Sequence, residues 1–295
     1  MTSSRRDFIR SAALLAGAVP LAAACSTTDP TKERSGGGTL ARAKQQGYIQ
    51  VGFANESPYG YTDTSGKLTG EAPELARVVF KELGINEVKG VQLDFAGLIG
   101  GLQARRFDVI AAGMFVTPER CAQVAFADPD YIATTGFMVP KGNPKGIQRF
   151  EDAAKKNVKL GVLTGAVEGD YATKLGVKKD NVKTFADQPS AFEGLKAGRI
   201  DAIALTRISL VDTLKKHQGA PYEVTPSFIP QIGGKPQYGA GAFAFRKADS
   251  DLLSAFNGKL TELKQNGRLL GIIQPFGFSK AELPGSHTAA ELCKG

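Results

Sequence analysis

The segment Thr117–Arg120 combines residue types that together can bind an anion. Thr117 can cap a helix, Pro118 suits the first helical position and Glu119 suits the first turn, so we expect a helix to begin here. A helix N-terminus presents free N–H groups and the positive end of the helix dipole, both of which favour an anion. Arg120 adds a planar, permanently charged guanidinium that can hold a carboxylate. The segment predicts a carboxylate site, although a surface arginine on a capped helix would have the same pattern.

Residues for metal or redox chemistry are scarce. The chain has two histidines, His217 and His287, and three cysteines, Cys25, Cys121 and Cys293, with no Cys-x-x-Cys pair. A zinc site normally needs several such ligands at close spacing. We therefore expect no metal and no cofactor, and the chemistry must come from carboxylates, arginines, hydroxyls and aromatic rings.

The composition is typical of a globular protein. The 295 residues are 42% hydrophobic and 22% charged, with 35 glycines and a net charge of +8 at pH 7. The basic residues are scattered along the chain, which argues against a nucleic-acid partner. A chain of this length suggests about two domains.

Residues 1–24 have the features of an export signal. Arg5 and Arg6 precede an apolar stretch, residues 12–24, that is too short to span a hydrocarbon core of ~30 Å comfortably. The paired arginines are typical of the twin-arginine type. Small residues then lead into Cys25, which resembles a lipobox, where cleavage leaves a lipid-bearing cysteine; a plain signal peptide with a chance cysteine is the alternative.

The predicted mature protein therefore begins at Cys25. Loss of residues 1–24, with three arginines and one aspartate, leaves a net charge of +6. Residues 25–38 are rich in Thr, Ser, Gly and charge, so we expect a flexible tether. The mature protein is expected to be an exported lipoprotein that faces the periplasm or the cell exterior and is anchored to the membrane by lipid on Cys25.

An internal repeat indicates two related α/β halves. Apolar runs alternate with segments of helical spacing over residues 49–112, which predicts parallel sheets. Residues 101–111 match residues 194–204 at seven of eleven positions, and each copy has a helix end, an Arg-x-Asp turn and a strand. We expect two similar lobes, with ligands bound between them beyond the carboxyl ends of the strands.

The expected lobe boundaries follow from two β-rich crossings. Lobe 1 would comprise residues 39–136 and 240–295, and lobe 2 residues 137–239, joined by a two-strand hinge. Residues 239–244 also match the pattern G-x-G-x-x-A of dinucleotide sites. Their surroundings continue a strand rather than opening a helix, which favours a hinge strand.

Several short segments together resemble one family. They are the strand Gly52–Glu56 followed by Pro58 and Tyr59, the Gly70-Glu71 helix start, the loop Gly113–Arg120, and Phe126. With the export signal, they resemble a family-3 extracellular solute-binding protein of ABC importers over nearly all of residues 40–280. The resemblance implies a type II periplasmic-binding-protein fold, a small zwitterionic solute, permease subunits as partners, and a monomer without enzymatic activity.

The class of solute depends on the residues that this resemblance places at the cleft. In amino-acid binders of the family an aspartate usually holds the α-ammonium group, and the matching position here is Thr206. Aromatic faces instead stabilise a delocalised cation by about 0.5–2 kcal/mol each. The resemblance implies an aromatic box of Tyr59, Phe95 and Phe115. Core packing would also explain each of these rings taken alone.

The resemblance also implies polar contacts at both ends of the solute. Glu56 would accept N–H bonds from a cationic ring, while Arg120 and the Gly113 backbone would hold a carboxylate. In the second lobe, residues 164–168 open a helix whose N–H groups could meet the carboxylate. The second-lobe contacts implied are Ala166, Glu168 and Thr206. A compact zwitterion with a cyclic amidinium fits this set, which is similar to that of the ectoine/hydroxyectoine-binding member of the family.

Three alternatives remain open at this stage. One is a binding subunit for a polar or basic amino acid, and another is a cyclohexadienyl-dehydratase-like enzyme, which shares the expected fold but needs a tuned general acid or base. A sensor ectodomain is a third, disfavoured because no apolar span follows the body. Whether Cys121 and Cys293 form a disulfide also stays open, since the sequence does not reveal their separation.

Cys25→Ala tests the lipid anchor. The variant should still be exported but should no longer sediment with membranes, because the acyl chains that hold the protein at the bilayer are absent. Fractionation of cells in high salt, with the wild type as the control, measures this. A variant that stays membrane-bound under those conditions would contradict the anchor and point to the basic surface instead.

Overall fold

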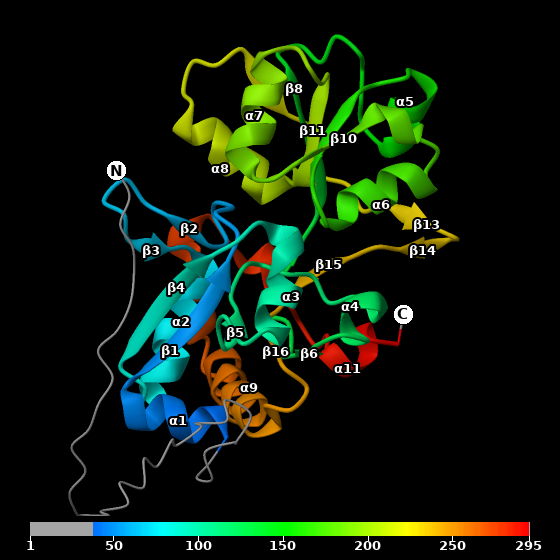
Figure 1. Cartoon of the computed structure of the whole chain (residues 1–295). Helices are drawn as coiled ribbons and strands as arrows, with labels where there is room; N and C mark the ends of the chain where they lie inside the picture. Colours follow the sequence, from blue (N-terminus) through cyan, green and yellow to red (C-terminus); the bar gives the residue numbers. More distant parts are fainter. Residues whose placement is uncertain (1–37, 295) are drawn as a thin grey trace, which may run out of the picture. The chain divides into compact units, whose positions relative to one another are not determined.

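The computed structural model describes residues 38–294 of the chain. The expected export signal, Cys25 and all of the tether except Gly38 lie outside the described residues. Residues 38–294 form two α/β lobes, each built around a five-stranded sheet (Figure 1). The predicted two-lobe α/β fold is therefore confirmed. Within this part of the chain, no helix combines the length and apolar character needed to cross a membrane.

The lobe 1 sheet has the strand order β4-β1-β5-β16-β6. Strand β1 (Tyr48–Phe53) runs parallel to both β4 (Glu87–Gln92) and β5 (Val109–Ile110). Strand β16 (Ala244–Phe245) runs antiparallel between β5 and β6 (Ala125–Phe126). The prediction of a parallel sheet is thus wrong for this edge, because β16 returns from lobe 2 and enters the sheet from the opposite direction.

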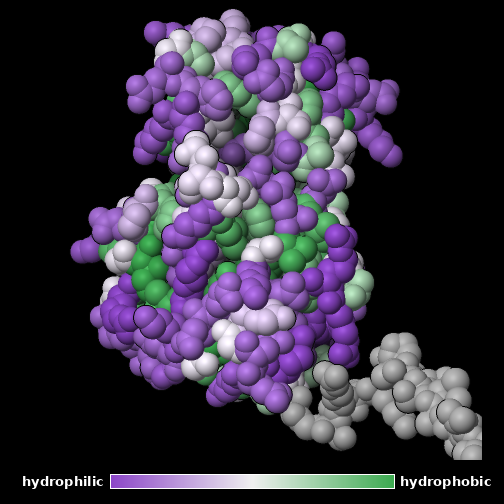
Figure 2. Space-filling model, turned by 60° about the vertical axis from the view of Figure 1, so that its left-hand side comes forward, coloured by the Kyte–Doolittle hydropathy of each residue, from purple (hydrophilic) through white to green (hydrophobic). Residues whose placement is uncertain are grey.

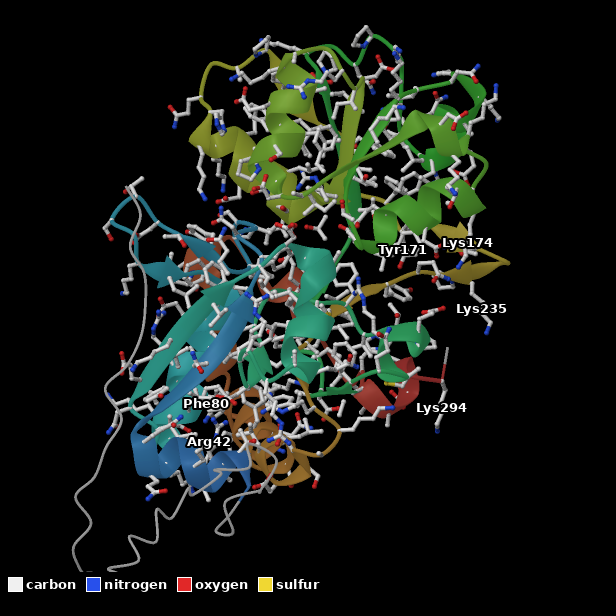
Figure 3. The ribbon with its side chains drawn as sticks, in the orientation of Figure 1. Arg42, Phe80, Tyr171, Lys174, Lys235 and Lys294 are labelled. Atoms are coloured by element: carbon white, nitrogen blue, oxygen red, sulfur yellow. A yellow bond between two sulfur atoms is a disulfide. The ribbon has the colours of Figure 1, made fainter. Side chains whose placement is uncertain are left out.

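Two layers of helices cover the lobe 1 sheet. One face packs against α1 (Thr39–Gln46), α2 (Glu71–Glu82), α9 (Ser250–Gln265) and α10 (Arg268–Ile273), and the other against α3 (Leu98–Gln103) and α11 (Ala289–Leu292). The buried residues of α2 recur at helical spacing and end at Phe80, labelled in Figure 3, whose ring lies 5.5 Å from that of Phe256 in α9.

Lobe 2 repeats this plan with the strand order β10-β9-β11-β8-β12. Strand β9 (Leu160–Leu163) is parallel to β10 (Val182–Phe185) and β11 (Ala202–Thr206), while β8 (Thr135–Pro140) runs antiparallel between β11 and β12 (Tyr222–Val224). The fourth strand is again the one that crosses between lobes. Helices cover both faces of this sheet: α5 (Phe150–Lys155) and α6 (Val167–Lys174) on one, α7 (Gln188–Lys196) and α8 (Arg207–Lys216) on the other.

Short elements complete the described chain. They are β2 (Tyr61–Thr62), β3 (Leu68–Thr69), α4 (Pro118–Cys121), β13 (Gln231–Ile232), β14 (Lys235–Pro236) and the 3-10 turns η1 (Phe95–Gly97), η2 (Lys179–Asn181), η3 (Gln274–Phe276) and η4 (Lys280–Glu282). Strands β13 and β14 form a hairpin.

The internal repeat corresponds to one local structure built twice. Asp108 donates its N–H to the Gln50 carbonyl at 2.9 Å and its carboxylate accepts the Gln50 N–H at 3.3 Å. Asp201 makes the same two bonds with Lys159, both at 2.8 Å. Each aspartate therefore ties the turn after a helix to the start of the neighbouring strand. The interpretation of the repeat as two related halves is confirmed at the level of individual hydrogen bonds.

Two strands join the lobes, as the hinge prediction required. They are β7 (Tyr131–Ala133) and β15 (Gly239–Gly241), which pair antiparallel. A Cβ atom on Gly241 would lie 2.0 Å from the Tyr131 ring, and one on Gly239 would lie 2.3 Å from the Phe115 ring. The glycines of the G-x-G-x-x-A pattern thus make room for aromatic rings, and the segment is a strand rather than a dinucleotide site.

A disulfide joins Cys121, at the end of α4, to Cys293, just after α11, with the two Cα atoms 5.7 Å apart. The bond fastens the C-terminal segment to lobe 1 beside Arg120.

Gly241→Ala tests the packing of the hinge. The added methyl group overlaps the Tyr131 ring, so the variant should lose about 1–3 kcal/mol of unfolding free energy, measured by urea denaturation. Gly258→Ala is the matched control, because Gly258 lies in α9 with nothing within 4 Å of the added Cβ, and this variant should gain up to about 1 kcal/mol. Equal stability of Gly241→Ala and the wild type would show that the ring moves aside freely.

Candidate functional site

A small cavity lies between the two lobes, with about 20 Å³ open to the centre of a water molecule. All nine residues that the sequence predicted as ligand-binding line it, together with Val167 and Leu205, which the prediction missed. The lining residues are Glu56, Tyr59, Phe95, Gly113, Phe115 and Arg120 from lobe 1 and Ala166, Val167, Glu168, Leu205 and Thr206 from lobe 2. The two missed residues carry no chemical signal of their own, and only their positions next to predicted residues could have indicated them.

The lobe 1 residues follow the carboxyl ends of its parallel strands, as the fold class requires. Glu56 and Tyr59 lie in the turn after β1, in which Glu56 and Gly60 exchange two backbone hydrogen bonds of 3.0 Å. Phe95 begins η1 after β4, and Gly113 and Phe115 follow β5. Three different strands therefore bring these side chains together.

Arg120 is held by contacts with both lobes. Its guanidinium donates to the Phe115 carbonyl at 2.8 Å in lobe 1 and to the Gly165 carbonyl at 3.0 Å in lobe 2. The guanidinium carbon also lies 5.3 Å from the centre of the Phe95 ring. Burial lowers the pKa of Arg120, yet an arginine side chain keeps its charge in proteins. A half-buried cation with N–H donors beyond the two used here can hold a carboxylate.

The helix that carries Arg120 contributes less than expected. The predicted start is correct, since Thr117 caps α4 and Pro118 is its first residue. However, α4 has only four residues, and the Thr117 hydroxyl accepts the Arg120 N–H at 3.3 Å. An anion at this place would therefore meet the guanidinium rather than a strong helix dipole.

Two buried carboxyl groups face the cavity from opposite lobes. Glu56 and Glu168 are 7% and 3% exposed. Burial first, and then the negative charge of Glu168, raise the pKa of Glu56 to about 8, against a hydrogen bond from Ser209 that lowers it. Burial also raises the pKa of Glu168 to about 7, against the lowering by its own backbone N–H and by Arg120. A bound cation would offset the cost of ionising these two acids.

Tyr59 and Thr206 bond to each other across the lobes. The Tyr59 hydroxyl donates to Thr206 Oγ1 at 2.8 Å, and Thr206 caps α8 by accepting the Ser209 N–H at 3.4 Å. The Tyr59 ring stacks on Tyr131, with 5.1 Å between centroids. Thr206 therefore supplies a neutral hydroxyl that is already engaged, rather than a carboxylate for an ammonium group.

Two features of position 113 require a glycine, the backbone conformation and the closeness of neighbouring rings. Its φ angle is +64°, and an added Cβ would lie 2.5 Å from the Tyr59 ring. The Tyr131 hydroxyl donates to the Gly113 carbonyl at 2.8 Å. The glycine thus lets the backbone approach the cavity closely.

One N–H group at the start of α6 is already in use. Ala166 is the N-cap residue and provides no side-chain cap, but its N–H already donates to the Leu163 carbonyl at 3.1 Å. Glu168 lies in the first turn, and Tyr171, labelled in Figure 3, follows three residues later on the same helix. Burial and the charge of Glu168 raise the pKa of Tyr171 above its ordinary value. Lobe 2 therefore presents mainly an acidic side chain to the cavity.

The molecular surface in the view of Figure 2 is mainly hydrophilic, with hydrophobic residues in separate patches. Among residues 38–294, Tyr238 is the one large hydrophobic side chain that is clearly exposed. Most of the other aromatic side chains pack into the lobes, and three of them line the cavity.

Comparison with known proteins defines the class of this protein. Residues 49–279 match the model of the bacterial extracellular solute-binding proteins, family 3, and the chain belongs to this family.

Individual relatives support the same assignment. The chain is 35% identical over 285 residues to the "Probable amino-acid ABC transporter periplasmic-binding protein y4tE" of Sinorhizobium fredii, covering 95% of this chain and 94% of that protein. EhuB in complex with hydroxyectoine gives a TM-score of 0.79 at 36% identity, covering 86% of this chain and 97% of that one. AncCDT-1 is an ancestral amino acid-binding protein and a precursor of cyclohexadienyl dehydratase. Its structure gives a TM-score of 0.71 at 29% identity, covering 81% of this chain and 99% of that one.

The family and these relatives define the general function. The protein is an extracytoplasmic solute-binding subunit of an ABC transporter, it takes amino-acid-like ligands, and its partners are the permease subunits.

The buried acids predict a pH dependence of stability. Below about pH 4.5 Glu56 is protonated whether the protein is folded or unfolded, whereas up to about pH 8 only the folded form keeps the proton. The unfolding free energy should therefore fall as the pH rises from about 5 to 8, at up to 1.4 kcal/mol per pH unit for this group.

Urea denaturation across this range measures the slope for the wild type and Glu56→Gln. The variant should have a flatter profile, because it has no carboxyl group to ionise. Glu87→Gln, at a residue whose side chain is 60% exposed, serves as the control and should keep the wild-type slope. Identical slopes for Glu56→Gln and the wild type would contradict the raised pKa.

Proposed function

We propose that this protein captures ectoine or hydroxyectoine and delivers it to an ABC permease. The observation that carries the proposal is the arrangement of charge in the cavity, where Glu56 and Glu168 enter from opposite lobes and Arg120 lies among aromatic rings. The similarity to EhuB, whose structure was solved with hydroxyectoine, supports it. The proposal includes export by a twin-arginine signal, lipid attachment at Cys25 and function as a monomer.

A zwitterion with a delocalised cation suits these groups. Arg120 would bind the carboxylate, while Glu56 would accept N–H bonds from the amidinium ring and Glu168 would add negative charge from the other lobe. Tyr59, Phe95 and Phe115 would contact the ring, and their faces favour a weakly hydrated cation.

An amino acid is the second candidate, favoured by the relative y4tE. Glu56 or Glu168 could accept an α-ammonium group in place of the aspartate that Thr206 replaces. An enzymatic role is supported by two weaker observations. AncCDT-1 is described as a precursor of an enzyme, and the pKa of Glu56 is raised, as in a general acid.

Calorimetric titration of the mature protein separates the candidates. Ectoine, hydroxyectoine, L-glutamine and L-arginine would each be titrated under the same conditions, and ectoine or hydroxyectoine should bind most tightly. Tight binding of an amino acid without detectable ectoine binding would overturn the assignment and leave the fold intact. Turnover of a prephenate-type substrate would instead indicate an enzyme.

Arg120→Ala tests recognition of the carboxylate. Loss of a buried charge partner should weaken binding by roughly 2–5 kcal/mol, and Arg120→Lys should recover little because a point charge does not reproduce the planar guanidinium. Arg268→Ala, at a side chain that is 54% exposed on α10, is the control and should bind normally. A folded Arg120→Ala protein with affinity within threefold of the wild type would place the anchor elsewhere.

Phe115→Leu tests the cationic end of the ligand. The change keeps apolar volume but removes the aromatic face, so ectoine should bind about 1–2 kcal/mol more weakly. Phe80→Leu is the matched control: it lies in the lobe 1 core away from the cavity and should affect stability but not affinity. Unchanged ectoine affinity in Phe115→Leu would argue against an aromatic box.

Two further substitutions separate ectoine from an amino acid. Glu56→Gln should weaken ectoine binding, because the amide gives up the charge that faces the amidinium. Thr206→Asp should raise the affinity for L-arginine relative to ectoine, since it adds a carboxylate at the position that amino-acid binders use. The dissociation constants of both ligands measure this, and a loss of both affinities in Thr206→Asp would show that the site does not accept an ammonium group there.

A further inference from the structure

The turn that carries Glu56 is bonded directly to lobe 2 through Gln188. This glutamine is the first residue of α7 and is 7% exposed. Its Oε1 accepts the Ser57 N–H at 3.3 Å, and its Nε2 donates to the Ser57 carbonyl at 3.0 Å. Both backbone polar groups of Ser57 are therefore satisfied by one side chain from the other lobe.

The Gln188 amide also donates to Ser209, the residue that donates a hydrogen bond to Glu56. Gln188 Nε2 lies 2.6 Å from Ser209 Oγ and donates to it, and Ser209 Oγ lies 3.0 Å from Glu56 Oε1. A hydroxyl group has a single proton. Gln188 takes a lone pair of Ser209 Oγ, so the Ser209 proton faces two acceptors, Glu56 and the Ser57 carbonyl at 3.1 Å. Because Gln188 Nε2 already donates to that carbonyl, the chain of donors runs from Gln188 through Ser209 to Glu56.

A charged rim surrounds this buried chain. The Ser57 hydroxyl donates to Asp212 at 2.6 Å, Lys216 pairs with Asp212 at 2.9 Å, and the Lys216 ammonium lies 4.1 Å from the centre of the Tyr61 ring. Lys216 also donates to the Ser57 hydroxyl. The Lys216 side chain is 44% exposed, so its pair should contribute little compared with the buried amide contacts.

We propose that Gln188 is a positioning residue for Glu56, which fastens the Glu56 turn to lobe 2 in the closed form and directs the Ser209 proton onto the carboxylate. We call the set Gln188, Ser209 and Ser57 the interlobe latch. The proposal rests on the proposed function only in assigning Glu56 to the cationic part of the solute.

The latch should act on the lifetime of the complex. Its hydrogen bonds join the two lobes, so they form when the lobes close and break when the lobes open. Interactions made after the first encounter change the dissociation rate more than the association rate. A latch that also orients the Ser209 proton should in addition influence the pH at which Glu56 becomes a good acceptor.

Gln188→Leu removes every polar contact of the amide at similar size. Its ectoine dissociation rate, measured by stopped-flow, should rise about tenfold, with the association rate within twofold of the wild type. Because an ionised Glu56 is the better acceptor for a cation, affinity should rise with pH in the wild type. In Gln188→Leu this rise should move to higher pH, since the carboxylate loses its oriented donor. Glu168, Tyr59, Tyr131 and Arg120 are the other titratable groups around Glu56, and the variant leaves them unchanged.

Ser209→Ala and the double variant test whether Gln188 acts through Ser209. Ser209→Ala should shift the pH profile in the same direction, and the double variant should shift it no further than either single variant. Thr225→Val is the matched control, since it removes a buried hydrogen bond to the Phe137 N–H within lobe 2. The control should lower the melting temperature but leave the rates and the pH profile unchanged.

Each result decides for or against the latch. A dissociation rate in Gln188→Leu within twofold of the wild type, or an additive pH shift in the double variant, would overturn the proposal. If the wild type binds L-arginine and not ectoine, the proposed ligand is wrong, and the same rates are measured with L-arginine.

If the wild type binds neither ligand, exchange of the Ser57 amide proton, followed by NMR in the protein alone, decides the question. Faster exchange in Gln188→Leu than in the wild type supports the latch, whereas equal exchange overturns it. The Glu56 amide, which bonds to Gly60 within its own turn, serves as the internal reference.

Discussion

The rest of the site depends on one constraint, the free-energy cost of taking ionisable side chains out of water. Buried Glu56 and Glu168 and half-buried Arg120 surround one cavity, and an isolated charge buried in such a place would cost several kcal/mol. The protein reduces this cost by bonding Arg120 to two carbonyl groups and by raising the pKa of both acids. The cavity thereby presents acidic and basic groups side by side.

The aromatic side chains connect this cavity with the hinge. Tyr131 belongs to hinge strand β7, stacks on Tyr59 and donates to the Gly113 carbonyl, while its ring lies against Gly241 of β15. The short helix α4 has few hydrogen bonds of its own, and such a helix is marginal in isolation. The disulfide at Cys121 holds its end beside Arg120. The residues at the cavity and the hinge strands therefore pack together as one unit.

Much of the fold and of the candidate site could be predicted from the sequence. The repeated Arg-x-Asp turn predicted two related lobes because each aspartate makes the same backbone bonds. The mixed sheets were missed because strand direction depends on where a crossing strand re-enters, as β16 shows, and no local pattern records that. Gln188 was missed because an amide at a helix start has no chemical signature until the opposite lobe brings Ser57 to it. The Cys121–Cys293 pairing was left open since it joins residues 172 apart.

The two carbonyl contacts of Arg120 imply an order of events in time. Opening of the lobes breaks the bond to Gly165, which belongs to lobe 2, but not the bond to Phe115, which belongs to lobe 1. In the open protein the guanidinium thus keeps its contact with lobe 1, and the N–H group that bonded to Gly165 becomes free to donate. An arriving anion would meet a pre-oriented cation on lobe 1 first, and lobe 2 would add its contacts afterwards. Under the proposed role of Arg120, departure would reverse this order, so the carboxylate would be the last part of the solute to leave.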